Sequence, residues 1–360
     1  MSLFNHFLKV FPMRTQQTRF VLKISLLLVA LGYICSSPLH AQYQSKYPDI
    51  PIVDVHVHPG SVVDAANFIK VSERIKERHG SNLAFWIALS DPGKAAAEQM
   101  KEASNNRMLF TASQMSPARG LTMTAEQVIA KVRDDGYIGL KFWFGPPYRT
   151  LRDGQEGITR IDDPRFAEFF ASLEKANILM ASLHIADPNQ VFGNRGDWLK
   201  DPVYFWRQIR AFENVVAKYP DLTIIAAHGS WLVCQDAQLD FLRYMFSTYP
   251  NFYLDISATC QYIPLVNREN LRDLYIEYQD RILFGTDGGR VGDDNMVNYI
   301  TGRYANFFAI LETDDIVSGG YFGNNPTKGL ELPREVLEKI YYKNALKLYP
   351  GLKEAMGIQE

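Results

Sequence analysis

The stretch Pro51-Ile52-Val53-Asp54-Val55-His56-Val57-His58 is an apolar run rich in β-branched residues, which predicts a β-strand. Alternate side chains of a strand point to the same face, so Asp54, His56 and His58 are expected to project together. Two imidazoles on one face can bind a single divalent cation. The alternative is that both histidines are hydrogen-bonded polar groups at a strand end, and this stretch alone favours neither reading.

Seven further short apolar runs follow this first one, and each is predicted to be a strand. They are Leu83 to Leu89, Met108 to Ala112, Ile138 to Trp143, Ile178 to His184, Leu222 to His228, Phe252 to Ile256 and Ile282 to Asp287. Strand-helix alternation repeated eight times predicts an α/β fold of the (β/α)8 type, a TIM barrel. The alternative is an open doubly wound sheet, which normally carries a Gly-rich phosphate turn after its first strand. His58-Pro59-Gly60 stands there instead.

Amphipathic stretches between these runs are predicted to be helices. They are Ala95 to Ala103, Thr124 to Arg133, Pro164 to Ala176, Pro202 to Lys218, Ala237 to Ser247 and Arg268 to Tyr278, with Pro333 to Leu348 as a final helix. Asp91, Asp163 and Asp201 each precede a proline and are expected to cap a helix start. No Pro/Gly/Ser-rich linker interrupts residues 51–311, so residues 42–360 are predicted to form a single domain.

The first 41 residues are predicted to be a cleavable secretory signal peptide. Basic residues precede the apolar run Ile24 to Ile34, which is too short to span a bilayer, and Ala41 precedes a polar start. Met13 is an alternative start. An uncleaved membrane anchor is less favoured because Pro38 breaks the segment. We therefore expect a secreted or periplasmic protein with no membrane attachment after cleavage.

The bulk composition narrows the range of partners. The chain has 360 residues, of which 47% are hydrophobic, so it can bury a large core. Its formal net charge is −2 and it has no basic stripe, which argues against nucleic acid as a partner. Cys234 and Cys260, which follow the leader, do not make a disulfide framework. A small-molecule substrate is the expected partner, and the sequence is compatible with a homo-oligomer.

Four of the five histidines that follow the leader end predicted strands. His56 and His58 end the first, His184 the fifth and His228 the sixth, while Asp287 ends the eighth. In a TIM barrel the carboxyl ends of the strands meet on one rim, where active sites of this fold lie. These five side chains are therefore predicted to form one metal centre. Asp54 lies deeper on the same face and is expected to be a structural carboxylate.

Several motifs occur in a specific order along the chain. They are Asp54-Val55-His56-Val57-His58, Tyr219-Pro220-Asp221-Leu222 leading to Ala227-His228-Gly229, Tyr253-Leu254-Asp255-Ile256-Ser257, Phe284-Gly285-Thr286-Asp287, and Asn344-Ala345 before Leu348-Tyr349. In this order they resemble the amidohydrolase superfamily of metal-dependent TIM-barrel enzymes, most closely its amidohydrolase-2 branch. The resemblance spans nearly all of residues 52–349.

The resemblance implies a divalent ion bound by His56, His58, His184 and Asp287, with His228 beside it as an acid/base or carbonyl-polarising group. Zn2+ is the expected ion, and Mn2+ is the alternative. In binuclear members of the superfamily, a carboxylated lysine on the fourth strand bridges two metals, and Lys141 stands in a matching place. We expect an unmodified lysine and one metal, with a binuclear site as the alternative.

The activity implied by the resemblance is hydrolysis of a lactone, ester or amide bond in a small substrate by metal-activated water. Asp287 would accept the proton of the water, and His228 would stabilise the oxyanion or relay a proton. The same branch contains non-oxidative decarboxylases of cyclic or aromatic carboxylates, which is the alternative. A non-catalytic binding protein is less favoured, because none of the expected ligands is missing.

Aromatic and basic residues follow several of the predicted strands and are expected to line the mouth of the barrel. The candidates for substrate binding are Trp143, Tyr148, Arg149, Trp198, Trp231 and Arg290. Aromatic rings together with arginines favour a flat or ring-shaped anion, since a guanidinium pairs well with a carboxylate. The alternative is that these arginines face solvent, and at most one is expected to contact substrate.

Overall fold

The structure is a computed structural model that describes residues 43–115, 117–145, 156–188, 202–317 and 326–358. The predicted signal peptide, its alternative start Met13 and the predicted cap Asp201 lie outside the described residues.

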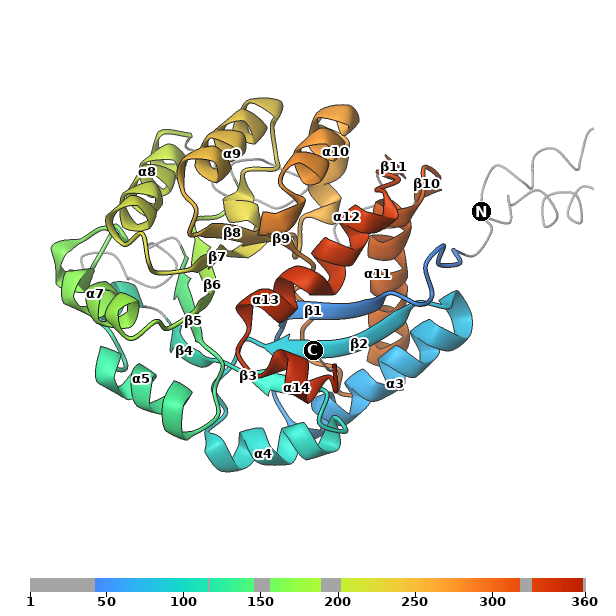
Figure 1. The fold of residues 1–360 in the computed structure, drawn as a ribbon, viewed down its shortest axis with the longest axis horizontal. Coiled ribbons are helices and arrows are strands. Elements are labelled where there is room, and N and C mark those ends of the chain that lie inside the picture. The colour runs from blue at the N-terminus through green and yellow to red at the C-terminus, as the bar shows by residue number, and fades with distance from the viewer. Residues whose placement is uncertain (1–42, 116, 146–155, 189–201, 318–325, 359–360) are drawn as a thin grey trace, which may run out of the picture. The chain divides into compact units, whose positions relative to one another are not determined.

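Parallel strands form the centre of the molecule (Figure 1). They are β1 (Pro51–Val57), β2 (Asn82–Ala88), β3 (Met108–Phe110), β4 (Ala112–Met115), β5 (Leu140–Phe144), β6 (Met180–Ile185), β7 (Ile224–Ala226), β8 (Phe252–Asp255) and β9 (Ile282–Leu283). Strands β1 to β3 pair in chain order, and so do strands β4 to β9.

Backbone hydrogen bonds join these two sheets into one closed barrel. Between β3 and β4 the amide of Thr111 donates to Ala88 (3.1 Å), and that of Ala112 donates to Gly139 (3.0 Å). The predicted run Met108 to Ala112 is thus one irregular strand that changes its bonding pattern at Thr111 and continues to Met115. At the other junction, the amide of Val55 donates to Phe284 (3.0 Å). The predicted TIM barrel is confirmed.

Helices surround the strands (Figure 1). The longer ones are α3 (Val62–His79), α4 (Lys94–Ala103), α5 (Ala125–Asp134), α7 (Ala167–Lys175), α8 (Pro202–Lys218), α9 (Asp236–Thr248), α10 (Arg268–Glu277) and α11 (Asp294–Glu312). Short 3₁₀ segments are η1 (Pro117–Arg119), η2 (Pro164–Phe166), η3 (Ala227–Trp231), η4 (Cys260–Leu265) and η5 (Gln279–Arg281), and β10 (Ile316–Val317) pairs with β11 (Thr327–Lys328). None of the helices in the described ranges combines the length and apolar character needed to cross a membrane.

Two expectations about helix ends need correction. Asp163 caps η2 by accepting from the amide of Arg165, but Asp91 caps no helix, because α4 begins only at Lys94. Asp91 instead accepts hydrogen bonds from the hydroxyl of Tyr137 (2.7 Å) and from the amide of Gly93 (3.2 Å), which precedes the helix. The predicted final helix is divided into α12 (Arg334–Glu338), the π-helical segment η6 (Lys339–Lys343) and α13 (Asn344–Leu348), followed by α14 (Leu352–Ala355).

The interior of the barrel is filled and closed at its amino-terminal end. Inward-facing residues of the strands, such as Val53 and Ile225, form one apolar cluster with residues of α13 and α14, among them Tyr349 and Leu352. The hydroxyl of Tyr349 donates to the carbonyl of Ala181 on β6 (3.2 Å). Because C-terminal helices cover this end, the opposite end, where the strands finish, is left for polar chemistry.

Candidate metal centre

The structure brings all five predicted side chains together at the carboxyl ends of the strands. His58 Nε2 lies 3.1 Å from Asp287 Oδ1, and His56 Nε2 lies 3.5 Å from the same oxygen. The rings of His56 and His228 are 4.8 Å apart between centroids, and His228 Nε2 lies 3.2 Å from His184 Nδ1. These contacts form one continuous cluster.

His228 and Asp287 lie beyond the strands that were predicted to end in them. Strand β7 ends at Ala226 and β9 at Leu283, so the predicted strands Leu222 to His228 and Ile282 to Asp287 are too long at their carboxyl ends. Both residues have φ of 57°, in the left-handed region. This conformation costs a residue other than glycine about 1–2 kcal/mol and is common at functional sites, where the surrounding structure enforces it.

His56 presents a buried nitrogen that has no partner in the protein. Its Nδ1 lies 2.9 Å from Asp255 Oδ2, which assigns the ring proton to Nδ1 and leaves a lone pair on Nε2. His56 Nε2 is buried without a hydrogen bond. Burial lowers the pKa of His56 to about 3, although the Asp255 carboxylate acts in the opposite direction. A neutral, buried imidazole with a bare nitrogen has the chemistry of a metal ligand.

His184 and His228 face each other with two bare nitrogens. His228 Nδ1 lies 3.0 Å from the carbonyl oxygen of Ser257, and His184 Nε2 lies 3.2 Å from that of Ala186. Since carbonyls only accept, these nitrogens carry the ring protons, and the two facing nitrogens carry lone pairs. Burial lowers the pKa of both histidines, so neither supplies a proton to bridge them. The two facing lone pairs repel each other, and a cation beside the pair would relieve this repulsion.

Asp287 supplies the negative charge of the cluster. Burial alone would raise its pKa, but the hydrogen bond from His58 and the electrostatic interactions with the neighbouring imidazoles outweigh burial and place its pKa below the usual range. The ligand atoms of His56, His228 and Asp287 all lie within 4.8 Å of one another. Nitrogen and oxygen ligands about 2.0–2.2 Å from a tetrahedral ion lie about 3.4 Å apart, so the 3.5 Å between His56 Nε2 and Asp287 Oδ1 suits a divalent ion shared by these two groups.

The compact trio formed by His56, His228 and Asp287 differs from the ligand set that the resemblance implies. It includes His228, whereas His58 contacts Asp287 from a half-exposed position and His184 contacts the trio through His228. The strand-end argument could not separate these positions, because all five residues follow from it equally. The metal content of variants that each lack one of these five side chains would distinguish the ligands from the other residues.

Two residues that the site depends on, Asp255 and Ser257, were not singled out from the sequence. The buried Asp255 carboxylate contacts His56 Nδ1 and accepts from the backbone amides of His228 (3.1 Å) and Ser257 (3.0 Å). Burial acts to raise the pKa of Asp255, and interactions with His56 outweigh it, so the group is ionised. A signal was available, because both residues stand in the motif Tyr253-Leu254-Asp255-Ile256-Ser257, at the carboxyl end of the predicted strand Phe252 to Ile256.

Asp54 is used for structure rather than as a ligand. It accepts hydrogen bonds from the amide of His56 (2.9 Å) and from the hydroxyls of Thr286 and Tyr304 (2.5 Å each). Burial raises the pKa of Asp54 to about 6, although these hydrogen bonds act to lower it. The carboxylate ties β1 to the segment that carries Asp287.

Lys141 lies beneath the cluster. It is buried on β5, and its Nζ donates to the hydroxyl of Ser182 (3.1 Å). Burial lowers the pKa of Lys141 to about 8, although the charges of Asp287 and Asp255 act to raise it. An unmodified amine with this pKa can balance the charge of the two carboxylates.

Two of the predicted mouth residues flank the histidines. The Trp231 ring stacks on that of His228, with centroids 4.4 Å apart and an angle of 21° between planes. Trp143 lies 5.6 Å from His184 between ring centroids. Arg290 is exposed beyond Asp287. Tyr148, Arg149 and Trp198 lie outside the described residues.

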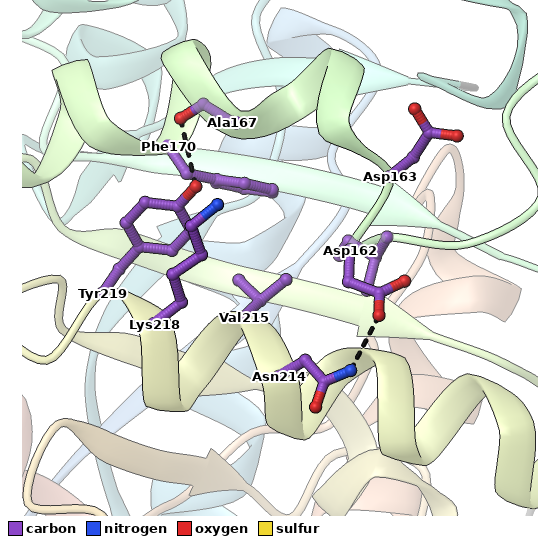
Figure 2. A pocket seen from close by; sticks show the side chains of 9 residues that line it. Asp162, Asp163, Ala167, Phe170, Asn214, Val215, Lys218 and Tyr219 are labelled. Atoms are coloured by element: carbon purple, nitrogen blue, oxygen red, sulfur yellow. Dashed lines mark hydrogen bonds between the residues drawn. The ribbon is translucent and has the colours of Figure 1, made fainter.

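A separate cavity of about 230 Å³ lies outside the barrel, between the η2–α7 segment and α8 (Figure 2). There Asn214 donates to Asp162 (2.8 Å), and the hydroxyl of Tyr219 donates to the carbonyl of Ala167 (3.1 Å). Its polar groups thus bind one another, and no residue of the metal centre lines it.

Comparisons with known proteins place the chain in one family. The family model Amidohydro_2, described as amidohydrolase, matches residues 53–351. A search of curated proteins gives no significant match. Similar solved structures include an uncharacterized TIM-barrel protein from Bordetella bronchiseptica, with 16% identity, coverage of 85% of this chain and 99% of that chain, and a TM-score of 0.49. Amidohydrolase 2 from Bifidobacterium longum subsp. infantis has 10% identity, coverage of 86% and 100%, and a TM-score of 0.41. An organophosphorus hydrolase variant from Deinococcus radiodurans has 12% identity, coverage of 88% and 86%, and a TM-score of 0.37.

Proposed function

The chain belongs to the amidohydrolase family, and from this membership we propose that it is a metal-dependent hydrolase of a lactone, ester or amide bond in a small substrate. The observation that carries the proposal is the buried His56 Nε2, which forms no hydrogen bond with the described residues and faces an ionised Asp287. A nitrogen buried in this way costs free energy unless a ligand satisfies it.

We assign the ion to His56, His58, His184 and Asp287. Each presents an imidazole nitrogen or a carboxylate oxygen to the cluster, and Asp255 fixes the orientation of His56 through its Nδ1. The donor set of nitrogen and oxygen suits Zn2+, with Mn2+ as the alternative. One ion is proposed, because an unmodified Lys141 cannot bridge two.

A divalent ion held by these residues would supply a Lewis acid and would lower the pKa of water to about 7. The Asp287 carboxylate accepts the proton of the attacking water and delivers it to the leaving group. His228, held flat against Trp231, would relay this proton from Asp287 to the leaving group through its Nε2 lone pair, so that the proton taken from water ends on the leaving group. Trp143 and Trp231 form apolar walls that suit a small, flat substrate.

The proposal extends to location and partners. The protein is exported through a signal peptide that ends at Ala41, acts outside the cytoplasm on a small molecule and binds no nucleic acid. N-terminal sequencing of the exported protein tests this part, and a mature chain that begins at Gln42 is the expected result.

Turnover of a defined panel tests the reaction. Metal-loaded protein is assayed with lactones, esters, amides and aromatic carboxylic acids, before and after chelation and after Zn2+ or Mn2+ is restored. Hydrolysis that disappears on chelation and returns with metal supports the proposal. Release of carbon dioxide without incorporation of water would show a decarboxylase. Stoichiometric metal with no turnover on any member would show a binding protein.

A further inference from the structure

We propose that Tyr304, on the outer helix α11, positions two groups of the metal centre, His56 and Asp287, through the carboxylate of Asp54. Tyr304 is a positioning residue, because its hydroxyl bonds Asp54 and Asp54 in turn bonds the segments that carry the two groups. The inference rests on the proposed function in that it requires a divalent ion at the centre, and it adds a determinant of the affinity for that ion.

The Tyr304 hydroxyl is held in one orientation. The residue is fully buried, and its hydroxyl lies 3.2 Å from the indole Nε1 of Trp86 on β2 and 2.5 Å from Asp54 Oδ2. An indole nitrogen only donates, so the hydroxyl accepts from Trp86 and gives its own proton to Asp54. Strand β2 and helix α11 thus fix the place of one carboxylate oxygen inside the molecule.

The Asp54 carboxylate joins the two segments of the metal centre. Its Oδ1 accepts from the backbone amides of His56 (2.9 Å) and Thr286 (3.1 Å), and its Oδ2 accepts from the Thr286 hydroxyl (2.5 Å) as well as from Tyr304. The bond from Tyr304 comes from outside the two segments that the other bonds join. It therefore sets the position of the joined pair relative to the helix layer.

The turn that carries Asp287 is held by hydrogen bonds on both sides. Thr286 Oγ1 accepts from the amide of Gly288 (3.2 Å), and the Thr286 carbonyl accepts from the guanidinium of Arg303 on α11 (3.2 Å). Asp287 stands between Thr286 and Gly288 with φ of 57°, a conformation that persists where surrounding contacts enforce it. Two consecutive residues of α11 thus support this turn, Arg303 directly and Tyr304 through Asp54.

These bonds bear on the separation of two groups that face the ion. His56 Nε2 and Asp287 Oδ1 lie 3.5 Å apart, and their segments meet at Asp54. Residues that orient metal ligands typically change metal affinity by about 10- to 100-fold when they are replaced. A contact that served only the stability of the fold would lower the unfolding free energy and leave this separation, and hence the metal affinity, unchanged.

Binding of Co2+ tests the proposal, because the visible absorption of this ion changes with its coordination. Tyr304→Phe should weaken Co2+ affinity by about 10-fold or more, measured by competition with a chromophoric chelator, and should shift the absorption of the bound ion. Tyr341→Phe is the matched control, since Tyr341 is also buried and its hydroxyl donates to the buried carboxylate of Glu312 (3.1 Å). Its affinity should stay within about two-fold of wild type, with an unchanged spectrum.

A pair of variants at Thr286 tests the same carboxylate from its other side. Thr286→Val removes the hydroxyl that bonds Asp54 and should weaken Co2+ affinity by a similar factor, whereas Thr286→Ser keeps the hydroxyl and should restore most of it. This pair decides the question if Tyr304→Phe does not fold.

The outcomes separate this inference from the proposed function. Wild-type affinity and spectrum in Tyr304→Phe, or equal losses in Tyr304→Phe and Tyr341→Phe, would overturn the positioning role and leave the hydrolase proposal intact. The expected losses without turnover of any substrate would remove the hydrolase proposal and leave the positioning role standing. A wild-type protein that binds no Co2+ would overturn both.

Discussion

At the scale of single residues, the centre is defined by which imidazole nitrogen carries a proton. Asp255 fixes that choice for His56, and the Ser257 carbonyl fixes it for His228. The sequence identified His56 and His228 because histidines at strand ends converge in a barrel. It could not identify their proton-accepting partners in the same way, because a partner's role depends on side-chain geometry that residue spacing does not contain.

Asp255→Asn should weaken divalent-metal affinity by about 10- to 100-fold, because the amide cannot orient His56 and raise its basicity as a carboxylate does. Competition with a chromophoric chelator measures the affinity. Asp91→Asn, which alters a carboxylate bonded to Tyr137 and Lys131 rather than to the cluster, should leave it unchanged. Equal affinities for wild type and Asp255→Asn would show that Asp255 does not support the site.

His228→Ala should keep its metal and lose about 10²- to 10⁴-fold in kcat, because it removes a proton-transferring group and no assigned ligand. Metal analysis and steady-state kinetics on the same preparation give both numbers. Because His228 Nε2 belongs to the compact trio with His56 and Asp287, loss of the metal together with the rate would reassign His228 as a ligand.

The titration of Lys141 should make the unfolding free energy of the metal-free protein depend on pH. Its pKa is about 8 when folded and about 10.4 when unfolded, so the unfolded state binds more protons between these values and stability rises with pH across that window. The unfolding free energy of wild type relative to Lys141→Met should therefore increase by about 3 kcal/mol between pH 7 and pH 11. Urea denaturation at a series of pH values measures it. A flat difference curve would point to a modified lysine.

At the scale of elements, the repeated strands and helices follow from the period of the apolar residues, and most of them could be predicted. The strand ends could not. His228 and Asp287 leave β7 and β9 in left-handed turns, because hydrogen bonds from neighbouring segments, such as His58 to Gly288, outweigh the local preference for extended backbone. At Thr111 the strand likewise changes its hydrogen-bonding partner, because the amide of Thr111 bonds β2 and that of Ala112 bonds Gly139. This change follows from the closure of the barrel, which local sequence patterns do not predict.

Gly285 is an element-scale requirement of the site. A Cβ there would lie 3.0 Å from His56 Cβ and 3.2 Å from Ser257 Cβ, and neither atom can swing away. Gly285→Ala should therefore lower the unfolding free energy by about 1–3 kcal/mol and weaken metal binding. Gly302→Ala, within α11 and with no atom within 4 Å of the new Cβ, should instead raise stability by about 0.5–1 kcal/mol. Urea denaturation measures the unfolding free energy of both variants. Equal changes in the two would contradict the close packing of His56 and Ser257 around Gly285.

At the scale of the whole molecule, a barrel closed below by α13 and α14 leaves one end for chemistry, and the ends of its strands converge there. The position of the centre could thus be predicted from the sequence, since it follows from topology. The division of these side chains into ligands and other residues could not, because it depends on side-chain geometry such as the 3.2 Å between His228 Nε2 and His184 Nδ1.

The most direct test of the central claim is the metal content of wild type and His56→Ala after reconstitution with Zn2+ and exhaustive dialysis, measured by inductively coupled plasma mass spectrometry. The expected result is about one ion per chain in wild type and less than about a tenth of that in His56→Ala, because the buried Nε2 loses its role as a ligand. Equal metal in both proteins, or none in wild type, would contradict the account.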